Sequence, residues 1–205
     1  MSTLQKTFLT PEQYLEIERK AEFKSEYYEG EMFAMAGASW AHNLIVWNLV
    51  TGFGQQLRKG PCRGTPSDMR VRISPSGLYT YPDITIVCGE PQFLDERRDT
   101  LLNPSLIVEV LSPSTEAYDR GRKFKHYRSV ESVSQYLLVS SEQVSAELFT
   151  RQPDGGWRLI AVSSMEDSLD LQSVGCRLAL ADVYEKVDLT ATGPDVTGLD
   201  VTRQD

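Results

Sequence analysis

Two acidic residues stand inside runs of residues that are otherwise typical of buried β-strands. Asp83 lies near the start of residues 81–88 and Glu109 near the end of residues 106–111, and β-branched side chains dominate both runs. If these strands pair antiparallel, the start of the first lies beside the end of the second. The two carboxylates would then lie close together at one edge of a sheet.

A pair of carboxylates in apolar surroundings is costly unless it is hydrogen-bonded, paired with a cation or bound to a metal. The chain supplies cations shortly downstream, in the run RGRKFK at residues 120–125. Two acids and a lysine that converge on one point suit an oxygen-ligand metal site for phosphodiester hydrolysis. Mg²⁺ fits such a site, because it binds through one or two carboxylates and completes its shell with water and substrate phosphate.

The sequence before this acid pair predicts two helices and a hairpin. Thr10 and Pro11 begin a helix that runs to about residue 20, with Tyr14 and Ile17 facing inward and Leu15 as a further candidate. Strands at residues 23–28 and 31–36 flank Glu29-Gly30, a compact hairpin turn. Ser39 caps a helix that reaches about residue 58, in which one buried stripe is expected, formed by Leu44, Trp47, Val50 and Leu57.

After Glu109 the chain turns into a helix expected over residues 116–129. Lys123 and Tyr127 are four residues apart and therefore share one face of that helix. This spacing can aim the Lys123 ammonium at the sheet edge that carries Asp83 and Glu109.

The remaining pattern adds strands and turns. We expect a strand region at residues 61–73, in which Asp68 is a turn or strand-start residue, and a charged surface loop at residues 89–104. Further elements are a central strand at 135–139, a hairpin of 144–150 with 157–162, a short strand at 168–171 and a closing helix at 180–187. The fold class is α/β (α+β): a mixed central sheet flanked by helices, with an extra β-hairpin near the C-terminus. Residues 1–187 are expected to form a single domain, followed by an acidic, disordered tail at 188–205.

Composition limits the functional classes. Of 205 residues, 40% are hydrophobic and 24% charged, which is typical of a globular protein, and no apolar run could span a membrane or serve as a signal peptide. Three scattered cysteines favour a reducing compartment over a disulfide framework, so we expect a cytoplasmic protein. The net charge of −8 counts against general nucleic-acid affinity, although basic residues cluster at 120–128.

Several short motifs, in order, match one known family. They are Pro82-Asp83, the run from Glu109 to Thr115, the run from Asp119 to Phe124, and Tyr127, preceded by Glu26, Gly30-Glu31, the run from Met35 to Ser39, and His42-Asn43. Over roughly residues 10–184 the chain resembles the Uma-type endonucleases, a branch of the PD-(D/E)XK restriction-endonuclease-like superfamily. The broad motif has a lysine two residues after the second acid, where this chain has Leu111. In the Uma-type branch the corresponding lysine lies on the helix that follows, and Lys123 matches it.

The resemblance implies a restriction-endonuclease-like core and assigns site residues. Glu26 would be an additional acid at the metal edge, and His42 a group that supports the site or contacts substrate. Tyr127 is a further candidate to support the site, and Gln135 is another from its position at the start of the strand expected at residues 135–139. Restriction enzymes often act as dimers, so a homodimer is expected by resemblance.

The leading functional hypothesis is a Mg²⁺-dependent endonuclease acting on nucleic acid, with DNA as the expected substrate and Mn²⁺ as a possible substitute ion. Asp83 and Glu109 would hold the ion, the Val110 carbonyl would be a further ligand, and Lys123 would orient the attacking water or stabilise charge on the phosphoryl oxygens. The alternative is a non-catalytic module that keeps the fold and binds nucleic acid or protein through residues 89–104 and 120–128. A third reading makes the acid pair a general acid and base for a glycosidic bond, but no aromatic sugar platform is evident nearby.

Overall fold

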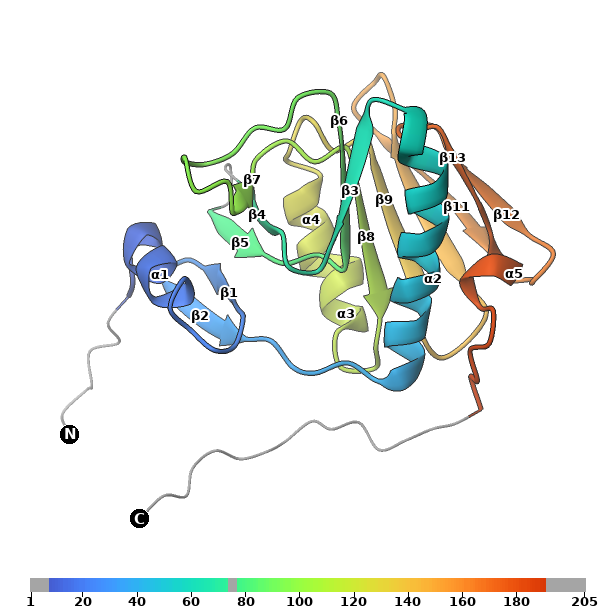
Figure 1. The fold of residues 1–205 in the computed structure, drawn as a ribbon, viewed down its shortest axis with the longest axis horizontal. Helices are drawn as coiled ribbons and strands as arrows, with labels where there is room; N and C mark the ends of the chain where they lie inside the picture. The colour runs from blue at the N-terminus through green and yellow to red at the C-terminus, as the bar shows by residue number, and fades with distance from the viewer. Residues whose placement is uncertain (1–7, 74–76, 191–205) are drawn as a thin grey trace, which may run out of the picture.

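The computed structural model describes residues 8–73 and 77–190, in which the strands form two large sheets and a hairpin (Figure 1). The six-stranded sheet is ordered β11 (Trp157–Val162), β10 (Ala146–Arg151), β9 (Gln135–Ser140), β8 (Leu106–Leu111), β6 (Ile84–Cys88) and β3 (Cys62–Pro66). The five-stranded sheet is ordered β2 (Glu31–Ala34), β1 (Ser25–Tyr28), β5 (Leu78–Thr80), β4 (Arg70–Ile73) and β7 (Thr100–Leu101). The separate hairpin is β12 (Ser168–Leu171) with β13 (Cys176–Ala179). The predicted mixed α and β architecture is confirmed.

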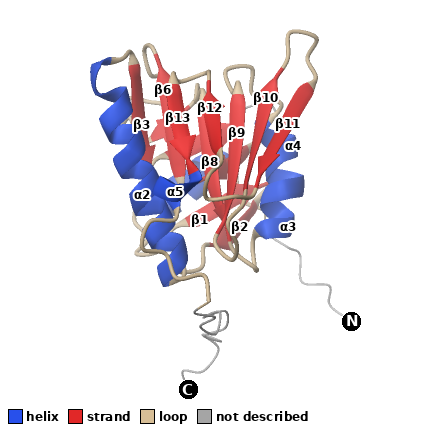
Figure 2. Cartoon of the chain, turned by 90° about the vertical axis from the view of Figure 1, so that its right-hand side faces the viewer, coloured by secondary structure: helices blue, strands red, loops and turns tan. Residues whose placement is uncertain are grey.

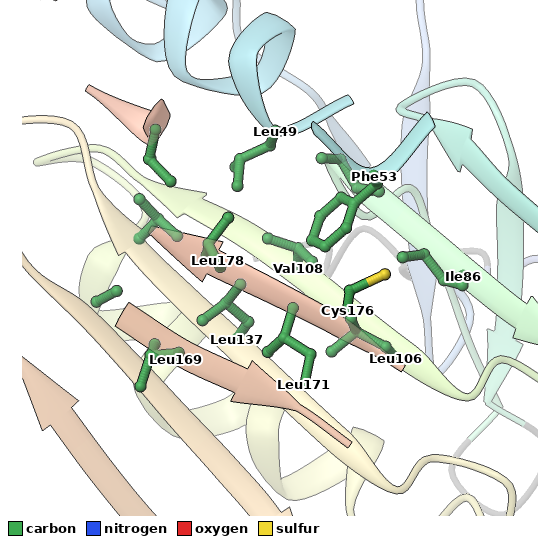
Figure 3. Packing of buried hydrophobic residues seen from close by; sticks show 14 of the residues in the cluster. Leu49, Phe53, Ile86, Leu106, Val108, Leu137, Leu169, Leu171, Cys176 and Leu178 are labelled. Atoms are coloured by element: carbon green, nitrogen blue, oxygen red, sulfur yellow. The ribbon is translucent and has the colours of Figure 1, made fainter. Parts of the chain in front are cut away.

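The helices are α1 (Pro11–Glu18), α2 (Trp40–Gln56) with a 3₁₀ turn (Leu57–Lys59), α3 (Glu116–Tyr118), a π-helical turn (Asp119–Lys123), α4 (Phe124–Tyr127) and α5 (Leu180–Val183). Helices α2 and α5 lie on one face of the six-stranded sheet and α3 and α4 on the other, as Figure 2 shows, whereas α1 packs against β1 and β5 of the five-stranded sheet. α2 packs with β12, β13 and α5 on one face (Figure 3), where Leu49 and Phe53 meet Val108 and Leu178. The α3–α4 segment covers the other face, where Tyr127 packs with Ile107 and Leu111.

The central strand β8 is buried on both faces, which explains its continuous apolar run. Leu106, Val108 and Val110 point into the core under α2. Ile107 and Leu111 point into the core under the α3–α4 segment. Glu109 lies between the last two, so alternation along the strand directs its carboxylate toward that second face.

β8 and β9 are parallel, whereas the other neighbouring strands of this sheet are antiparallel. Parallel neighbours need a long crossover, because the chain must return to the end of the sheet at which it started. Here the crossover is the α3–α4 segment. The topology therefore lays the helix that carries Lys123 over the face toward which Glu109 points.

Several predicted elements are confirmed with small shifts in their bounds. Thr10 and Gln13 form a capping box at the start of α1. Glu29 and Gly30 both have positive φ, 48° and 89°, as a two-residue hairpin turn requires between β1 and β2. The hairpin of β10 and β11 is also present. β13 was not predicted, and the closing helix is shorter than expected, since α5 ends at Val183.

The predicted buried face of α2 is wrong. The buried residues are Ile45, Leu49 and Phe53, whereas the indole of Trp47 is exposed and Leu44 and Val50 are only half-buried. Of the expected stripe, only Leu57 is buried, in the turn that follows the helix. Apolar residues occur almost all around the first half of α2, so their spacing does not fix which side faces the sheet.

One inward residue of α1 was also misassigned. Tyr14 and Leu15 are buried, but Ile17 is 45% exposed. Glu18 takes the inward position instead, where its Oε1 accepts hydrogen bonds from the Tyr81 hydroxyl at 2.9 Å and the Ser25 N–H at 2.9 Å. Periodicity could not reveal a buried acid whose partners lie on other segments.

Although no disulfide framework was expected, two of the three cysteines are paired. Cys62 on β3 lies directly opposite Cys88 on β6, and their sulfurs form a disulfide. Cys176 is free and buried. The pairing follows from the register of two strands that are far apart in sequence, which residue spacing alone does not give.

No helix within the described ranges is long and apolar enough to cross a membrane. The predicted tail lies outside the described residues from position 191 onward.

The observed orientation of α2 predicts opposite outcomes for two of its aromatic residues. Phe53→Ala should lower the free energy of unfolding by about 3–5 kcal/mol, because a buried ring is removed from a packed core. Trp47→Ala should change it by no more than about 0.5 kcal/mol, because that side chain is largely exposed. Urea denaturation of the two variants measures both values. Equal losses would contradict the observed orientation of the helix.

Candidate active site

A cavity of about 520 Å³ opens beside the C-terminal end of β8. Its lining comes from β1, the segment joining β2 to α2, the start of α2, β8 and the α3–α4 segment. The ionisable side chains that line it include Glu26, Asp83, Glu109, Asp119, Arg122 and Lys123. Acids and a lysine that are far apart in sequence therefore meet in one place.

Antiparallel pairing of β6 with β8 brings the first two acids together. Ile84 lies opposite Val108, and continuing this register by one residue places Asp83 opposite Glu109. Oδ2 of Asp83 accepts a hydrogen bond from the Val110 N–H at 2.7 Å, which fixes the carboxylate against the end of β8. The arrangement expected from the two strand patterns is present.

The Lys123 ammonium contacts three carboxylates. Its Nζ is 3.1 Å from Oε1 of Glu109, 3.2 Å from Oδ1 of Asp119 and 3.3 Å from Oε1 of Glu26. All four side chains are at least 89% buried. One cation therefore joins the five-stranded sheet, through Glu26, to the six-stranded sheet, through Glu109.

Hydroxyl groups hold two of these carboxylates in place. The Tyr127 hydroxyl donates to Oε1 of Glu109 at 2.8 Å. The hydroxyls of Thr80 and Tyr118 donate to the two oxygens of Glu26. The structure therefore brings Tyr127 to Glu109, while Thr80 and Tyr118 were not singled out from the sequence.

The lysine stands at the end of an unusual helical turn. Asp119 and Lys123 are the first and last residues of the π-helical turn, and both are buried. π-Helical turns are rare and frequently occur at functional sites. Asp119 belongs to a motif noted in the sequence, but no role was assigned to it there. Its position four residues before Lys123 was the available signal.

Crowding of the acids changes their ionisation. Burial, together with the nearby Asp119 and Asp83 carboxylates, raises the pKa of Glu109 to about 8 in spite of the Lys123 ammonium. Burial also raises the pKa of Asp119. Burial alone would lower the pKa of Lys123, but Glu109, Glu26 and Asp119 outweigh it and hold that pKa well above its usual value. Four acidic groups thus gather around one ammonium, and a further cation could take the place of the proton that Glu109 retains.

The oxygen donors available for such a cation are few. No group of three or more Asp, Glu, His or Cys side chains within the described ranges is placed to hold a metal ion unaided. Asp83 and Glu109, with the Val110 carbonyl at the end of β8, offer an incomplete set of hard oxygen donors. Such a set suits Mg²⁺ or Mn²⁺, which take remaining ligands from water and phosphate, rather than zinc.

His42 also reaches the acid pair. It lies in the first turn of α2, where its N–H bonds to the Ser39 side chain, and its Nε2 is 3.3 Å from Oδ2 of Asp83. The structure therefore brings together Asp83, Glu109, Lys123, Glu26, His42, Tyr127 and Val110.

Gln135 is not brought to this cavity. It pairs with Leu106, at the opposite end of β8 from Val110. Its side chain donates to Thr150 and accepts from Ser173, so it joins β9 to β10 and to the β12–β13 turn. Asp68 lies in a turn, as expected, and pairs with Lys24 while remaining largely exposed.

Comparisons with known proteins bear on the fold and the family. The model of a family named Uma2 and described as "Putative restriction endonuclease" matches residues 11–181. Two uncharacterized proteins of Synechocystis sp. are similar: one is 40% identical over 86% of this chain and 91% of its own length, the other 36% identical over 74% and 85%. A crystal structure from Anabaena variabilis, described as "a putative nuclease belonging to DUF820", has a TM-score of 0.69 and 16% identity, covering 86% of this chain and 97% of that one. The last likeness concerns the fold alone.

The raised pKa of Glu109 predicts a pH-dependent stability that Glu109→Gln should remove. The folded state keeps a proton up to about pH 8 that the unfolded state releases near the ordinary value of 4.5, so stability should fall as the pH rises between these values. One pKa unit corresponds to about 1.4 kcal/mol, so the wild type should lose a few kcal/mol relative to the variant. Thermal unfolding from pH 5 to pH 9, without divalent ions, measures the difference. Parallel pH profiles would show that Glu109 is not the group responsible.

Proposed function

The chain belongs to the Uma2 family, and from this membership we propose that it is a Mg²⁺-dependent endonuclease that hydrolyses phosphodiester bonds in nucleic acid, with DNA as the expected substrate. The observation that carries the proposal is the excess of buried carboxylates over the single Lys123 ammonium at the end of β8. Such crowding raises the free energy of the empty cavity and favours the binding of a divalent ion.

In this proposal Asp83 and Glu109 hold the ion, with the Val110 carbonyl as a further ligand and Mn²⁺ as a substitute for Mg²⁺. When bound, the ion would lower the pKa of the attacking water and polarise the scissile phosphate. The Val110 N–H and the His42 imidazole fix the Asp83 carboxylate, while Tyr127 fixes Glu109. These contacts hold the ligands before substrate arrives, which reduces the reorganisation required during the reaction.

Lys123 is proposed to act on the substrate side of the site. A divalent ion at Asp83 and Glu109 would compete with the ammonium for the Glu109 carboxylate. The ammonium could then orient the attacking water or stabilise negative charge on the phosphoryl oxygens. Glu26, which the Thr80 and Tyr118 hydroxyls hold, keeps the ammonium charged and positioned.

The alternative, a non-catalytic binding module, depends on surfaces that are partly engaged within the chain. Arg120 pairs with Glu116 and Glu147. In the charged loop, Asp95 and Asp99 both pair with Arg19. Since these charges are already compensated, they offer less to an external partner than the sequence suggests. The buried carboxylates around Lys123 would also have no role in such a module.

We also propose a homodimer that forms through β11, an edge strand of the six-stranded sheet. An edge strand presents unpaired backbone N–H and C=O groups, and Leu159 and Ile160 on β11 are 49% and 39% exposed. Antiparallel pairing of two copies about a two-fold axis would continue the sheet across both chains.

A cytoplasmic location remains our proposal as well. In that reducing compartment the Cys62–Cys88 disulfide would be reduced to two thiols.

Substitutions at the site should separate catalysis from folding. Asp83→Asn, Glu109→Gln and Lys123→Ala should each lower Mg²⁺-dependent cleavage of DNA by about 100-fold or more, because each removes a ligand or a charge from the proposed reaction centre. Asp68→Asn is the matched control, since Asp68 is an exposed turn residue outside the cavity and its loss should leave the rate unchanged. Circular dichroism would check that each variant folds.

Two outcomes would count against the nuclease. Undiminished cleavage by purified Asp83→Asn protein would rule out the assigned site. Binding of DNA without cleavage, and without any heat of Mg²⁺ or Mn²⁺ binding in calorimetry, would favour the non-catalytic module.

The dimer has its own test. Ile160→Lys should convert the protein to a monomer in light-scattering measurements, because a charge on the edge strand opposes pairing with a second copy. Met165→Lys, at an exposed apolar residue outside the strands, should leave the mass unchanged. A wild-type protein that is monomeric at micromolar concentration would refute the proposed interface.

A further inference from the structure

The two walls of the active-site cavity differ in chemistry. One wall carries the carboxylates and Lys123. The other is formed by the end of β2 and the segment that joins it to α2, where every residue from Phe33 to Ser39 lines the cavity. This segment, which reads FAMAGAS, contains no charged side chain and only small residues besides Phe33 and Met35. Phe33 lies directly opposite Glu26 in the register of β1 and β2, so an apolar surface lies beside the proposed reaction centre.

Large aromatic side chains stand exposed at both ends of this segment. Phe33, which lines the cavity, is 48% exposed, and Trp40, the residue after Ser39, is 76% exposed. Figure 1 shows the segment passing from β2 below α3 to the start of α2. Aromatic rings bury a large apolar area when a ligand covers them, so the exposure of Phe33 in the cavity lining indicates a binding surface.

Cations are scarce along the same cavity. Among the described residues that line it, the basic ones are Arg122 and Lys123, and Lys123 already contacts three carboxylates. Tight duplex binding normally draws on many contacts between basic side chains and phosphates, whose strength depends steeply on salt. The cavity can supply few such contacts, so affinity has to come largely from another source.

We propose, on the premise that the chain is a nuclease, that this cavity accepts an unpaired nucleotide, in a single strand or extruded from a duplex. The base would lie against the segment from Phe33 to Ser39 and stack on the Phe33 ring, while its phosphate would lie at the ion that Asp83 and Glu109 are proposed to hold. Bases within a duplex are stacked on one another, so only an unstacked base presents its face to an aromatic side chain. A cavity of about 520 Å³ is of a size that encloses a small molecule, whereas a duplex could contact only its rim.

Cleavage of matched substrates tests this specificity. Wild-type protein with Mg²⁺ is given one oligonucleotide sequence as a single strand, as a perfect duplex and as a duplex with one bulged nucleotide. The single strand, and the bulged position, should be cut at least about tenfold faster than the perfect duplex. Stacking on an aromatic side chain contributes about 1–3 kcal/mol per base, so Phe33→Ala should raise KM for the single strand about tenfold. Trp47→Ala, which removes an exposed ring of α2 that does not line the cavity, is the control and should leave KM unchanged.

A binding measurement keeps the specificity separate from the activity. Fluorescence anisotropy with Asp83→Asn protein should show tighter binding of the single strand than of the duplex. The double variant Asp83→Asn/Phe33→Ala should lose that preference. A plot of the logarithm of the binding constant against the logarithm of the salt concentration should have a slope no steeper than about −2. Equal cleavage of perfect duplex and single strand would overturn the specificity and leave the nuclease proposal standing. Preferential binding with no cleavage of any substrate by the wild type would overturn the nuclease and leave the binding cavity.

Phe33 and Trp40 could instead be covered by a second copy of the chain. Light scattering of the wild type and of Phe33→Ala decides this point. A change of mass on Phe33→Ala, with the preference for single strands intact, would overturn the stacking role.

Discussion

The contact of one buried ammonium with three carboxylates is the constraint on which the rest of the structure depends. Lys123 meets Glu26 from β1, Glu109 from β8 and Asp119 from its own helical turn. Each charge is tolerated in the interior only because the others are present, since removing one partner of a buried pair leaves the other uncompensated. The two large sheets are thereby held in one arrangement by charge as well as by apolar packing. Asp83 adds negative charge to this group from its place opposite Glu109.

The topology makes that contact possible. Because β8 and β9 are parallel, their crossover must pass over the sheet, and it crosses the face toward which Glu109 points. The antiparallel pairing of β6 with β8 places Asp83, which precedes β6, beside Glu109. The arrangement lowers stability, because a carboxyl group whose pKa rises to about 8 weakens the folded state at neutral pH. Acids kept at such a cost are typical of sites that bind an ion or perform a reaction.

The sequence predicted the features that depend on neighbouring residues. It did not predict the features that depend on how strands far apart in sequence pair with each other. The apolar run around Glu109, the hairpin at Glu29-Gly30 and the shared face of Lys123 and Tyr127 follow from neighbouring residues, and the structure has them. The Cys62–Cys88 disulfide depends on the pairing of β3 with β6, and the remoteness of Gln135 depends on the register of β9 against β8. No short-range pattern contains either register. The side of α2 that is buried was missed for a different reason, because a helix that is apolar almost all around has no distinctive stripe.

The place of the lysine has a consequence for how this chain can vary. In the broad superfamily motif the cation follows the second acid on the same strand, so strand pleating alone determines its direction. Here that strand position is Leu111, whose side chain is free to fill the core with Tyr127 and Ile107. The direction of the ammonium is set instead by the winding between Asp119 and Lys123, where the wider π turn accommodates an extra residue. The number of residues between Asp119 and Lys123, and not only their identity, therefore sets where the ammonium points, so an insertion or deletion in this turn would alter the site even where every other residue is kept.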